Sequence, residues 1–249
     1  MQRSVSRMKR RLGEGSAFAL RCSVPDSITG RACGRATMRA AGTGLAPHFC
    51  KRHVEHRARH GSHWHGTYTA SQLKPYISAA SSYVRLWAGN DRFIAAAIDA
   101  IQASLAEAGP VEIATRLRGL SAARRARIAL ARLRVAGIPA ERIVSIVLAV
   151  SALIEDDPAS HRTKEFRTVQ VAKAVHRLAS GTHKVWEIVD HQGRKGRTEL
   201  HAYPNSSGRV LRVMGRMLEE PCGWIVERHL AAVLAYKARY GRASRKASS

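Results

Sequence analysis

The feature that most constrains the fold is a long alanine-rich stretch, residues 71–179, in which apolar residues recur at helical spacing. Gly and Pro fall mainly in short breaks such as "AGND", "AGP", "AGIP" and "DDPAS". This pattern predicts a succession of helices. Asp91 and Ser121 are suited to capping helix N-termini, and Pro139 to a helix start. The predicted helices lie near residues 71–88, 91–108, 110–118, 121–136, 139–155 and 161–179.

The pattern changes to alternation in "THKVWEIVDHQGRKGRTELHAYP", residues 182–204, where "HQGRKGR" reads as a turn. Alternation around a Gly-containing turn predicts a β-hairpin, here near residues 184–203. Two further helices are predicted near residues 206–219 and 221–240. The basic segments at residues 1–20 and 241–249 are expected to be flexible or disordered.

Cysteines and a histidine gather near the N-terminus. Three of the four cysteines, Cys22, Cys33 and Cys50, lie close together in the sequence, and Cys50-x-x-His53 has the spacing of a metal knuckle that continues into a helix. Together they predict a Cys₃His zinc site, although ten residues separate Cys22 from Cys33, a wide gap for tight chelation. The alternative is reduced cysteines that only pack, which is the interpretation we favour for the distant Cys222.

The predicted fold class is therefore mostly α. A small Cys₃His zinc module at residues 21–69 is followed by an α-helical domain at residues 70–240 that contains one β-hairpin. We find no internal repeat at a fixed period.

The net charge of the chain limits the class of partner that it can bind. The chain has 42 Lys and Arg residues against 18 Asp and Glu, a formal net charge of +24. A surface this positive favours a polyanion as the partner, and nucleic acid is the first choice.

A membrane surface is the alternative polyanion, but the longest apolar run, residues 143–154, is too short to span a bilayer core of about 30 Å. The basic N-terminus is followed only by "AFAL", shorter than a signal-peptide core. We expect a cytoplasmic protein with no membrane contact.

The run "RCSV…ACGRAT…HFCKRHVEHRARHGS", residues 21–62, resembles the small Cys/His zinc-binding module of phage and mobile-element proteins related to HNH homing endonucleases. Cys22 and Cys33 match the first ligand pair of that pattern, and Cys50 and His53 match the second. The basic tail of the pattern corresponds to Arg57, Arg59, His60 and Gly61. The chain departs from the pattern by the wide first gap and by the insertion "MRAAGTGLAP" before the second pair.

The resemblance raises the possibility of a metal-dependent nuclease. An HNH site needs a general-base His, a metal-binding His and an orienting Asn. The chain has two asparagines, Asn90 and Asn205, and neither stands between suitably placed histidines. The enzymatic alternative is a second metal cluster formed by His60, His63 and His65, which His191 and His201 of the hairpin would join. Histidines in a basic, Gly-rich stretch are more often phosphate contacts or solvated.

Three basic segments are candidates for nucleic-acid contact. In the zinc module the candidate residues are Lys51, Arg52, Arg57, Arg59 and His60. In the predicted helix 121–136 they are Arg124, Arg125, Arg127, Arg132 and Arg134, which fan around an apolar stripe. In the predicted helix 161–179 they are Arg162, Gln170, Lys173 and Arg177, which share one face and resemble the reading face of a recognition helix. The alternative for both helices is an amphipathic helix with a solvated polar side.

The function that the sequence favours is a non-enzymatic nucleic-acid-binding accessory or regulatory protein of a phage or mobile element, with structural Zn²⁺ and double-stranded DNA as the expected partner. Two alternatives stay open. One is a metal-dependent, HNH-like nuclease or DNA-processing enzyme. The other is an RNA-binding or assembly protein whose charge serves a polyanion without reading its sequence.

Overall fold

The structure is a computed structural model that describes residues 21–25, 29–39, 45–46, 48–112, 117, 119–179, 182–202 and 206–246. The chain divides into two compact units. The N-terminal unit comprises residues 1–58 and 62–64, and the helical unit comprises residues 59–61 and 65–249. Each unit is described by itself.

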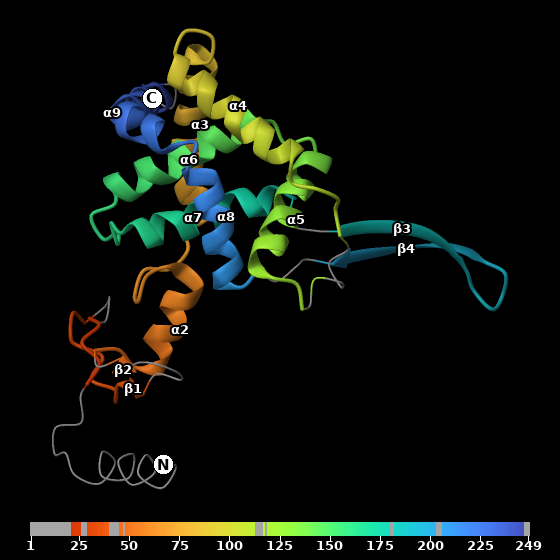
Figure 1. The fold of residues 1–249 in the computed structure, drawn as a ribbon, viewed down its shortest axis with the longest axis horizontal. Helices are drawn as coiled ribbons and strands as arrows, with labels where there is room; N and C mark the ends of the chain where they lie inside the picture. The colour runs from red at the N-terminus through yellow and green to blue at the C-terminus, as the bar shows by residue number, and fades with distance from the viewer. Residues whose placement is uncertain are drawn as a thin grey trace, which may run out of the picture. The chain divides into compact units, whose positions relative to one another are not determined.

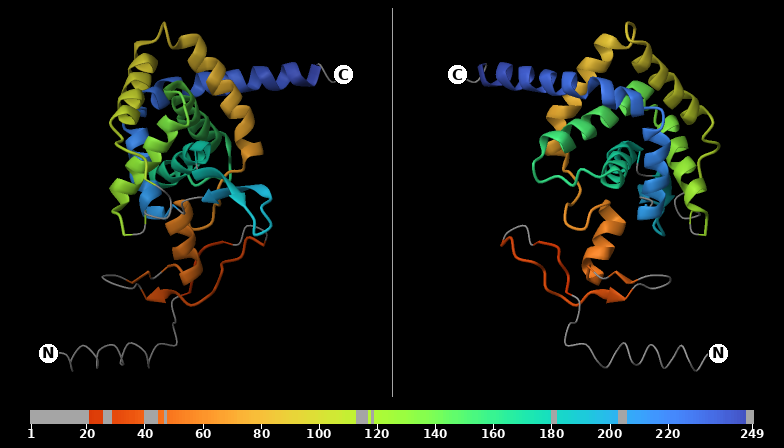
Figure 2. Two further views of the ribbon diagram at one scale, coloured as in Figure 1. Left: turned by 90° about the vertical axis from the view of Figure 1, so that its right-hand side faces the viewer. Right: turned by 60° about the vertical axis from the view of Figure 1, so that its left-hand side comes forward.

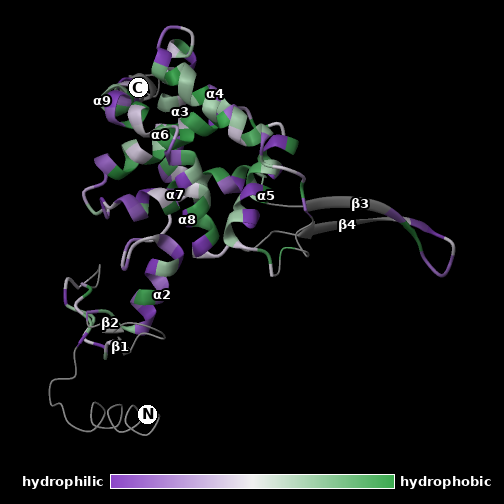
Figure 3. Cartoon of the chain, viewed as in Figure 1, coloured by the Kyte–Doolittle hydropathy of each residue, from purple (hydrophilic) through white to green (hydrophobic). Residues whose placement is uncertain are grey.

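The N-terminal unit is built on short antiparallel pairings. Strands β1 (Met38–Arg39) and β2 (Leu45–Ala46) pair with each other, and isolated bridges join Arg21 to Ala36 and Pro25 to Ala32. The buried cluster consists of Cys22, Val24 and Cys50, with Cys33 and Phe49 packed against it. Helix α2 (Lys51–His60) begins directly after Cys50 and has no buried residue, in keeping with its largely hydrophilic colouring in Figure 3. The apolar core formed by the described residues of this unit is therefore very small.

The helical unit begins with four helices close to the predicted ones: α3 (Ala70–Trp87), α4 (Arg92–Ala106), α5 (Ala122–Val135) and α6 (Ala140–Asp156). Their starts have a local cause. Thr69 caps α3 in a reciprocal capping box with Gln72, Asp91 accepts from two backbone N–H groups of α4, and Ser121 caps α5. Pro139 precedes α6 without a side-chain cap.

Helix α6 lies at the centre of the unit (Figure 1) and packs against α3, α4, α7 and α9. The apolar run at residues 143–154 is buried throughout, which explains why it has no polar face. Within the described chain no helix is both long enough and apolar enough to cross a membrane. The predicted buried helix is thus confirmed.

Helices α7 (Lys164–His176) and α8 (Gly208–Glu219) pack together, and the short helix η2 (Arg177–Ala179) continues α7. Two ion pairs connect them: Arg212 donates to Glu165 at 2.6 Å, and Arg167 donates to Glu219 at 3.0 Å. Thr168 also donates to Glu219. These contacts fix how the two helices lie against each other.

The hairpin consists of β3 (Thr182–Val189) and β4 (Lys195–Ala202), in antiparallel register from Thr182–Ala202 to Val189–Lys195. Its turn is closed by Asp190, whose carboxylate accepts from the backbone N–H groups of Gln192 and Arg194. Figure 1 shows the hairpin projecting away from the helices. The mostly helical fold with one hairpin is confirmed, and residue 203 lies outside the described residues.

Two boundaries differ from the sequence prediction. Residues 110–112, predicted to begin a helix, have no regular secondary structure and follow Gly109, whose φ of +81° lies outside the helical region; residues 113–116 and 118 of that predicted helix lie outside the described residues. Helix α9 (Gly223–Lys246) runs past residue 240 into the segment expected to be disordered, and its end extends beyond the other helices (Figure 2). The Ala, Arg and Lys residues there are good helix formers, so Gly241 alone does not end the helix. Residues 1–20 and 247–249 lie outside the described residues.

Candidate metal centre and basic surfaces

The four predicted metal ligands lie together. The ligand atoms of Cys22, Cys33, Cys50 and His53 are all within 4.8 Å of one another. His53 Nδ1 lies 3.1 Å from Cys22 Sγ and 3.5 Å from Cys50 Sγ. Cys22 and Cys50 are 1% and 3% exposed, while Cys33 and His53 are half-buried. Three thiols and an imidazole converging on one point could hold a metal ion.

Local backbone hydrogen bonds explain how the wide gap between Cys22 and Cys33 closes. The N–H of Cys33 donates to Val24 O at 2.8 Å, and the N–H of Cys22 donates to Arg35 O at 2.8 Å. Gly34, at φ +65°, then donates to Cys22 O. The bridge from Pro25 to Ala32 and these hydrogen bonds therefore return Cys33 to Cys22 across a β-bridged loop, instead of a tight knuckle.

The second ligand pair is set by the first turn of α2. The N–H groups of His53 and Val54 both donate to Cys50 O at 3.0 Å, so Cys50 and His53 lie on the same side of the turn. Burial, with the positive charges of Arg52, His56 and Arg35, lowers the pKa of His53. The lower pKa favours the neutral imidazole, which is the form that binds metal.

The basic residues of α2 lie on the outside, as predicted: Lys51, Arg52, Arg57 and Arg59 are exposed. Within the N-terminal unit a pocket of about 370 Å³ lies beside the metal ligands, and its lining includes Arg31, Arg35, Arg52, His53, His56 and Trp64. The three arginines are exposed, and Trp64 is 44% exposed. Arg31 and Arg35 were missed by the sequence reasoning, because the β-bridged loop that places them beside α2 leaves no periodic signal.

The histidines proposed as a second metal cluster have separate partners. His63 stacks on Phe49 with ring centroids 3.6 Å apart. His65 Nε2 lies 3.2 Å from Asp157 Oδ2. His60 Nδ1 lies 2.9 Å from both Thr67 Oγ1 and Lys173 Nζ. Over the described ranges, the one group arranged for a metal ion is the Cys₃His cluster. His191 is exposed in the hairpin turn, and the side chain of His201 lies outside the described residues.

Helix α5 does not offer all its predicted phosphate ligands. Arg132 is 6% exposed and donates to Glu112 O at 2.7 Å. Arg134 donates to Leu105 O, Ala106 O and Gly109 O at 2.6–2.9 Å, so it satisfies carbonyls at the end of α4. Helix α5 packs against α4 and α8, and Arg132 is buried there, whereas Arg134 is an exposed residue whose guanidinium group reaches back to the end of α4.

The other three arginines of α5 differ in exposure and in partners. Arg124 forms an ion pair with Glu112 at 3.3 Å, Arg125 is half-buried, and Arg127 is exposed. Of the five arginines predicted to contact phosphate on this helix, Arg132 is therefore excluded by burial, whereas Arg134 stays at the surface while it satisfies the carbonyls of α4.

The recognition-helix hypothesis for residues 161–179 also needs correction. Gln170 is 3% exposed; its Nε2 donates to His60 O and Gly66 O, and its Oε1 accepts from the Tyr68 N–H. A side chain with these bonds cannot read bases, since α7 packs between α6 and α8 and both its faces are covered.

The basic residues of the same segment are used in different ways. Lys173 donates to Thr67 Oγ1 at 2.7 Å, and burial, with the charge of Arg177, lowers its pKa to about 8. Arg162 pairs with Glu155 at 3.4 Å. Arg177 is exposed, with one N–H donating to Tyr68 O. Of the predicted reading face, Arg162 and Arg177 remain at the surface.

Comparison of the chain with models of protein families, with curated proteins and with solved structures found no match.

Proposed function

We propose that the protein is a non-enzymatic nucleic-acid-binding protein whose N-terminal unit is stabilised by Zn²⁺ and binds the phosphate backbone of double-stranded DNA. The observation that carries the proposal is the pocket of about 370 Å³ beside the predicted metal ligands, which is lined by Arg31, Arg35 and Arg52 together with the exposed Trp64. The resemblance of residues 21–62 to zinc modules of phage and mobile-element proteins supports an origin in such an element.

Zinc is the metal that suits this ligand set. Zn–S bonds of about 2.3 Å and Zn–N bonds of about 2.0 Å produce tetrahedron edges of roughly 3.5–3.8 Å. The separations from 3.1 Å up to the 4.8 Å limit bracket those edges. All four positions are filled by protein ligands, which is typical of a structural site, because a catalytic zinc keeps one position for water.

The small apolar cluster of the N-terminal unit gives the metal a role. Three buried residues, Cys22, Val24 and Cys50, contribute little hydrophobic free energy, and two of them are ligands. Metal-binding free energy then becomes folding free energy for this unit. The bound ion fixes the loop that carries Arg31 and Arg35 and the helix that carries Arg52.

Phosphate is the anion that suits the pocket. Arg guanidinium groups match phosphate oxygens in bidentate geometry, and the exposed indole ring of Trp64 provides a flat surface against sugar or base. A net charge of +24 adds long-range attraction for a polyanion. Contacts of this kind position the protein on the backbone and do not read sequence.

The experiment is a binding measurement by fluorescence anisotropy with a labelled DNA duplex at several salt concentrations. Arg31→Ala with Arg35→Ala is expected to weaken binding roughly tenfold near 0.1 M salt and to lower the salt slope by about 0.9 per lost phosphate contact. The matched control is Arg92→Ala with Arg228→Ala, which removes two exposed arginines that stack on Phe93 in the helical unit.

Equal affinity and equal salt slope for the two double variants would contradict the proposal, since binding would then depend on net charge alone. A duplex RNA of the same sequence tests the RNA-binding alternative. If the protein binds that RNA more tightly than the DNA, double-stranded RNA is the partner and not double-stranded DNA.

A further inference from the structure

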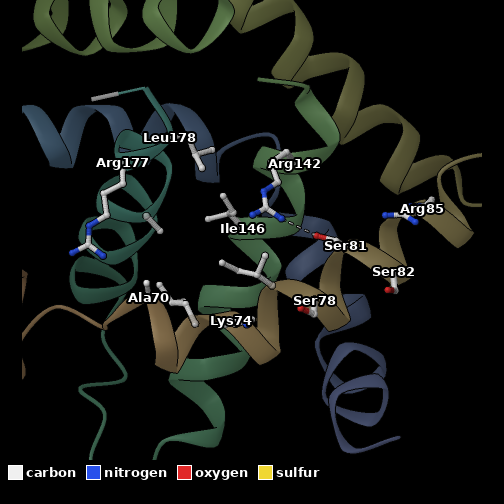
Figure 4. A pocket seen from close by; sticks show the side chains of 13 residues that line it. Ala70, Lys74, Ser78, Ser81, Ser82, Arg85, Arg142, Ile146, Arg177 and Leu178 are labelled. Atoms are coloured by element: carbon white, nitrogen blue, oxygen red, sulfur yellow. Dashed lines mark hydrogen bonds between the residues drawn. The ribbon is translucent and has the colours of Figure 1, made fainter. Parts of the chain in front are cut away.

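A second basic pocket lies within the helical unit, between α3, α6 and the end of α7. Its volume is about 620 Å³. Figure 4 shows Arg142 between Arg177 on one side and Arg85 on the other. Apolar side chains contribute part of the lining: Leu73, Ile77, Ile146 and Leu178. The basic and hydroxyl side chains that line it are Lys74, Arg85, Arg142, Arg177, Ser78, Ser81 and Ser82. We call it the α3 pocket.

Helix α3 supplies a continuous polar stripe to this pocket. Residues 74, 78, 81, 82 and 85 are spaced three, four or one apart, so they share one face of the helix. From Lys74 to Arg85 the stripe extends roughly 16 Å at 1.5 Å per residue. The stripe begins and ends on a cation and carries serine hydroxyls between them.

The charge of the α3 pocket is uncompensated. Four cations line it, and no Asp or Glu is among its lining residues. Throughout the described part of the chain, none of the four cations forms an ion pair. The Arg142 guanidinium donates to Ser81 Oγ at 3.3 Å, which holds it over the middle of the pocket. Arg142 is half-buried in a lining that includes Ile146, so its charge attracts an anion more strongly than a fully solvated charge would, because the local dielectric constant is lower.

We propose that the α3 pocket is a second binding site for the phosphodiester backbone of nucleic acid. The proposal rests on the proposed nucleic-acid-binding function and extends it from the N-terminal unit to the helical unit. In each strand of a duplex, phosphates recur about every 3.4 Å along the helix axis, so a stripe of this length faces several phosphates in succession. Cations and hydroxyl groups are the side chains that contact phosphate oxygens most often, and no group in the pocket repels them.

The length of the stripe favours a backbone over a small anion. A single phosphate would reach only part of it, whereas Lys74, Arg142 and Arg85 can each bind a different phosphate of one strand. Their combined contribution is electrostatic, so the site is expected to show strong salt dependence and little sequence preference.

The test is Lys74→Ala with Arg85→Ala in the full chain, measured against the same labelled duplex. Both side chains are exposed and Ala is the best helix former, so α3 is expected to keep its structure. The affinity is expected to fall roughly tenfold near 0.1 M salt, and the salt slope by about 0.9 for each lost contact. Arg92→Ala with Arg228→Ala is again the charge-matched control, and circular dichroism checks the fold of each variant.

A second variant tests the site without removing a cation. Ser78→Glu places a carboxylate in the middle of the stripe at an exposed position, so it is expected to weaken duplex binding several-fold, whereas Ser78→Ala is expected to change it much less. A common loss in both Ser78 variants would point to an effect on the helix and not on charge.

Three outcomes overturn the proposal in distinguishable ways. If the α3 variants bind like the control while Arg31→Ala with Arg35→Ala binds weakly, the proposed function stands and the α3 pocket is not part of it. If the unchanged protein binds no duplex even at low salt, both proposals fail. If the α3 variants lose affinity for inorganic tripolyphosphate but keep their affinity for duplex DNA and RNA, the pocket is a small-anion site.

Discussion

On α5, basic side chains of one type have different environments. Arg127 is exposed, Arg132 is buried against Glu112 O, and Arg134 satisfies the carbonyls at the end of α4. The difference comes from what lies opposite each side chain, because a guanidinium group binds whichever acceptors are within reach. The same holds on α7, where Lys173 lies against Thr67 and His60. A basic residue is therefore a candidate for phosphate only once its neighbours are known.

Lys173 gives a prediction on pH. Its pKa in the folded state is about 8, below the ordinary 10.5, so the unfolded chain holds the proton more tightly between these values. Stability is then expected to rise with pH across that window, by at most about 1.4 kcal/mol per pH unit from this group. Below pH 8 both states are protonated and the cost of burying the charge is full and constant. Urea unfolding from pH 7 to 10 measures this change in the free energy of unfolding.

Lys173→Met is the comparison for that measurement, since it keeps the length of the side chain and removes the titrating group. The difference in unfolding free energy between the native protein and this variant is expected to shift in favour of the native protein as the pH rises above 8. A difference that stays constant from pH 7 to 10 would show that Lys173 has an ordinary pKa.

The cysteines give a prediction on metal content. Freshly prepared, reduced protein is expected to carry about one zinc per chain, and Cys50→Ser to carry almost none, because a site with three ligands loses most of its affinity. Cys222→Ala is the control. Cys222 is fully buried in the helical core, where burial raises its pKa to about 12 and keeps it a thiol. Native mass spectrometry decides the point, and equal metal content in both variants would show that Cys50 is not a ligand.

At the scale of elements, the packing of α7 on α8 depends on a glycine. A Cβ added at Gly215 would meet the carbonyl group and the Cγ2 of Thr168. The carbonyl carbon of Thr168 would lie 2.9 Å from the added Cβ. Because most of that obstacle is backbone, the helices would have to separate. The close approach also lets Thr168 and Arg167 both reach Glu219.

Gly215→Ala is therefore expected to destabilise the protein by about 1–3 kcal/mol, in spite of the better helix propensity of Ala. Gly223→Ala is the matched control, because a Cβ there would meet nothing within 4 Å. Urea midpoints of the two variants give the comparison. If Gly215→Ala is as stable as Gly223→Ala, the two helices do not approach as closely as described.

At the scale of the whole molecule, the two units differ in how they are held together. The core of the helical unit runs from Tyr68 to Val233, and α6 is its centre. Among the described residues of the N-terminal unit, the buried hydrophobic cluster has three members, Cys22, Val24 and Cys50, and two of them are predicted metal ligands. The helical unit is therefore expected to fold through hydrophobic burial, and the N-terminal unit through metal binding.

A shortened chain that begins at residue 59 is accordingly expected to keep its helical circular dichroism and to bind duplex DNA more weakly. A chain that begins at residue 70 is expected to be less stable by about 3 kcal/mol or more, because it loses the buried ring of Tyr68. It also leaves Gln170 and Asp157 without the Tyr68 N–H and hydroxyl that they accept from. Thermal unfolding measures the stability of both shortened chains. If the chain that begins at residue 59 is unfolded, the helical unit needs residues 1–58 to fold.

Features that depend on local spacing could be predicted from the amino-acid sequence. Periodicity and caps such as Asp91 and Ser121 located most helices, alternation located the hairpin, and Cys50-x-x-His53 located the turn that starts α2. Only the tertiary structure decided what covers each face. Periodicity shows that α7 has a polar side, but packing against α6 and α8 and hydrogen bonds to His60 and Gly66 bury Gln170 there. The stripe from Lys74 to Arg85 is visible in the sequence, whereas Arg142 and Arg177 join it only through long-range packing, because contacts between helices depend on the whole core and not on neighbouring residues.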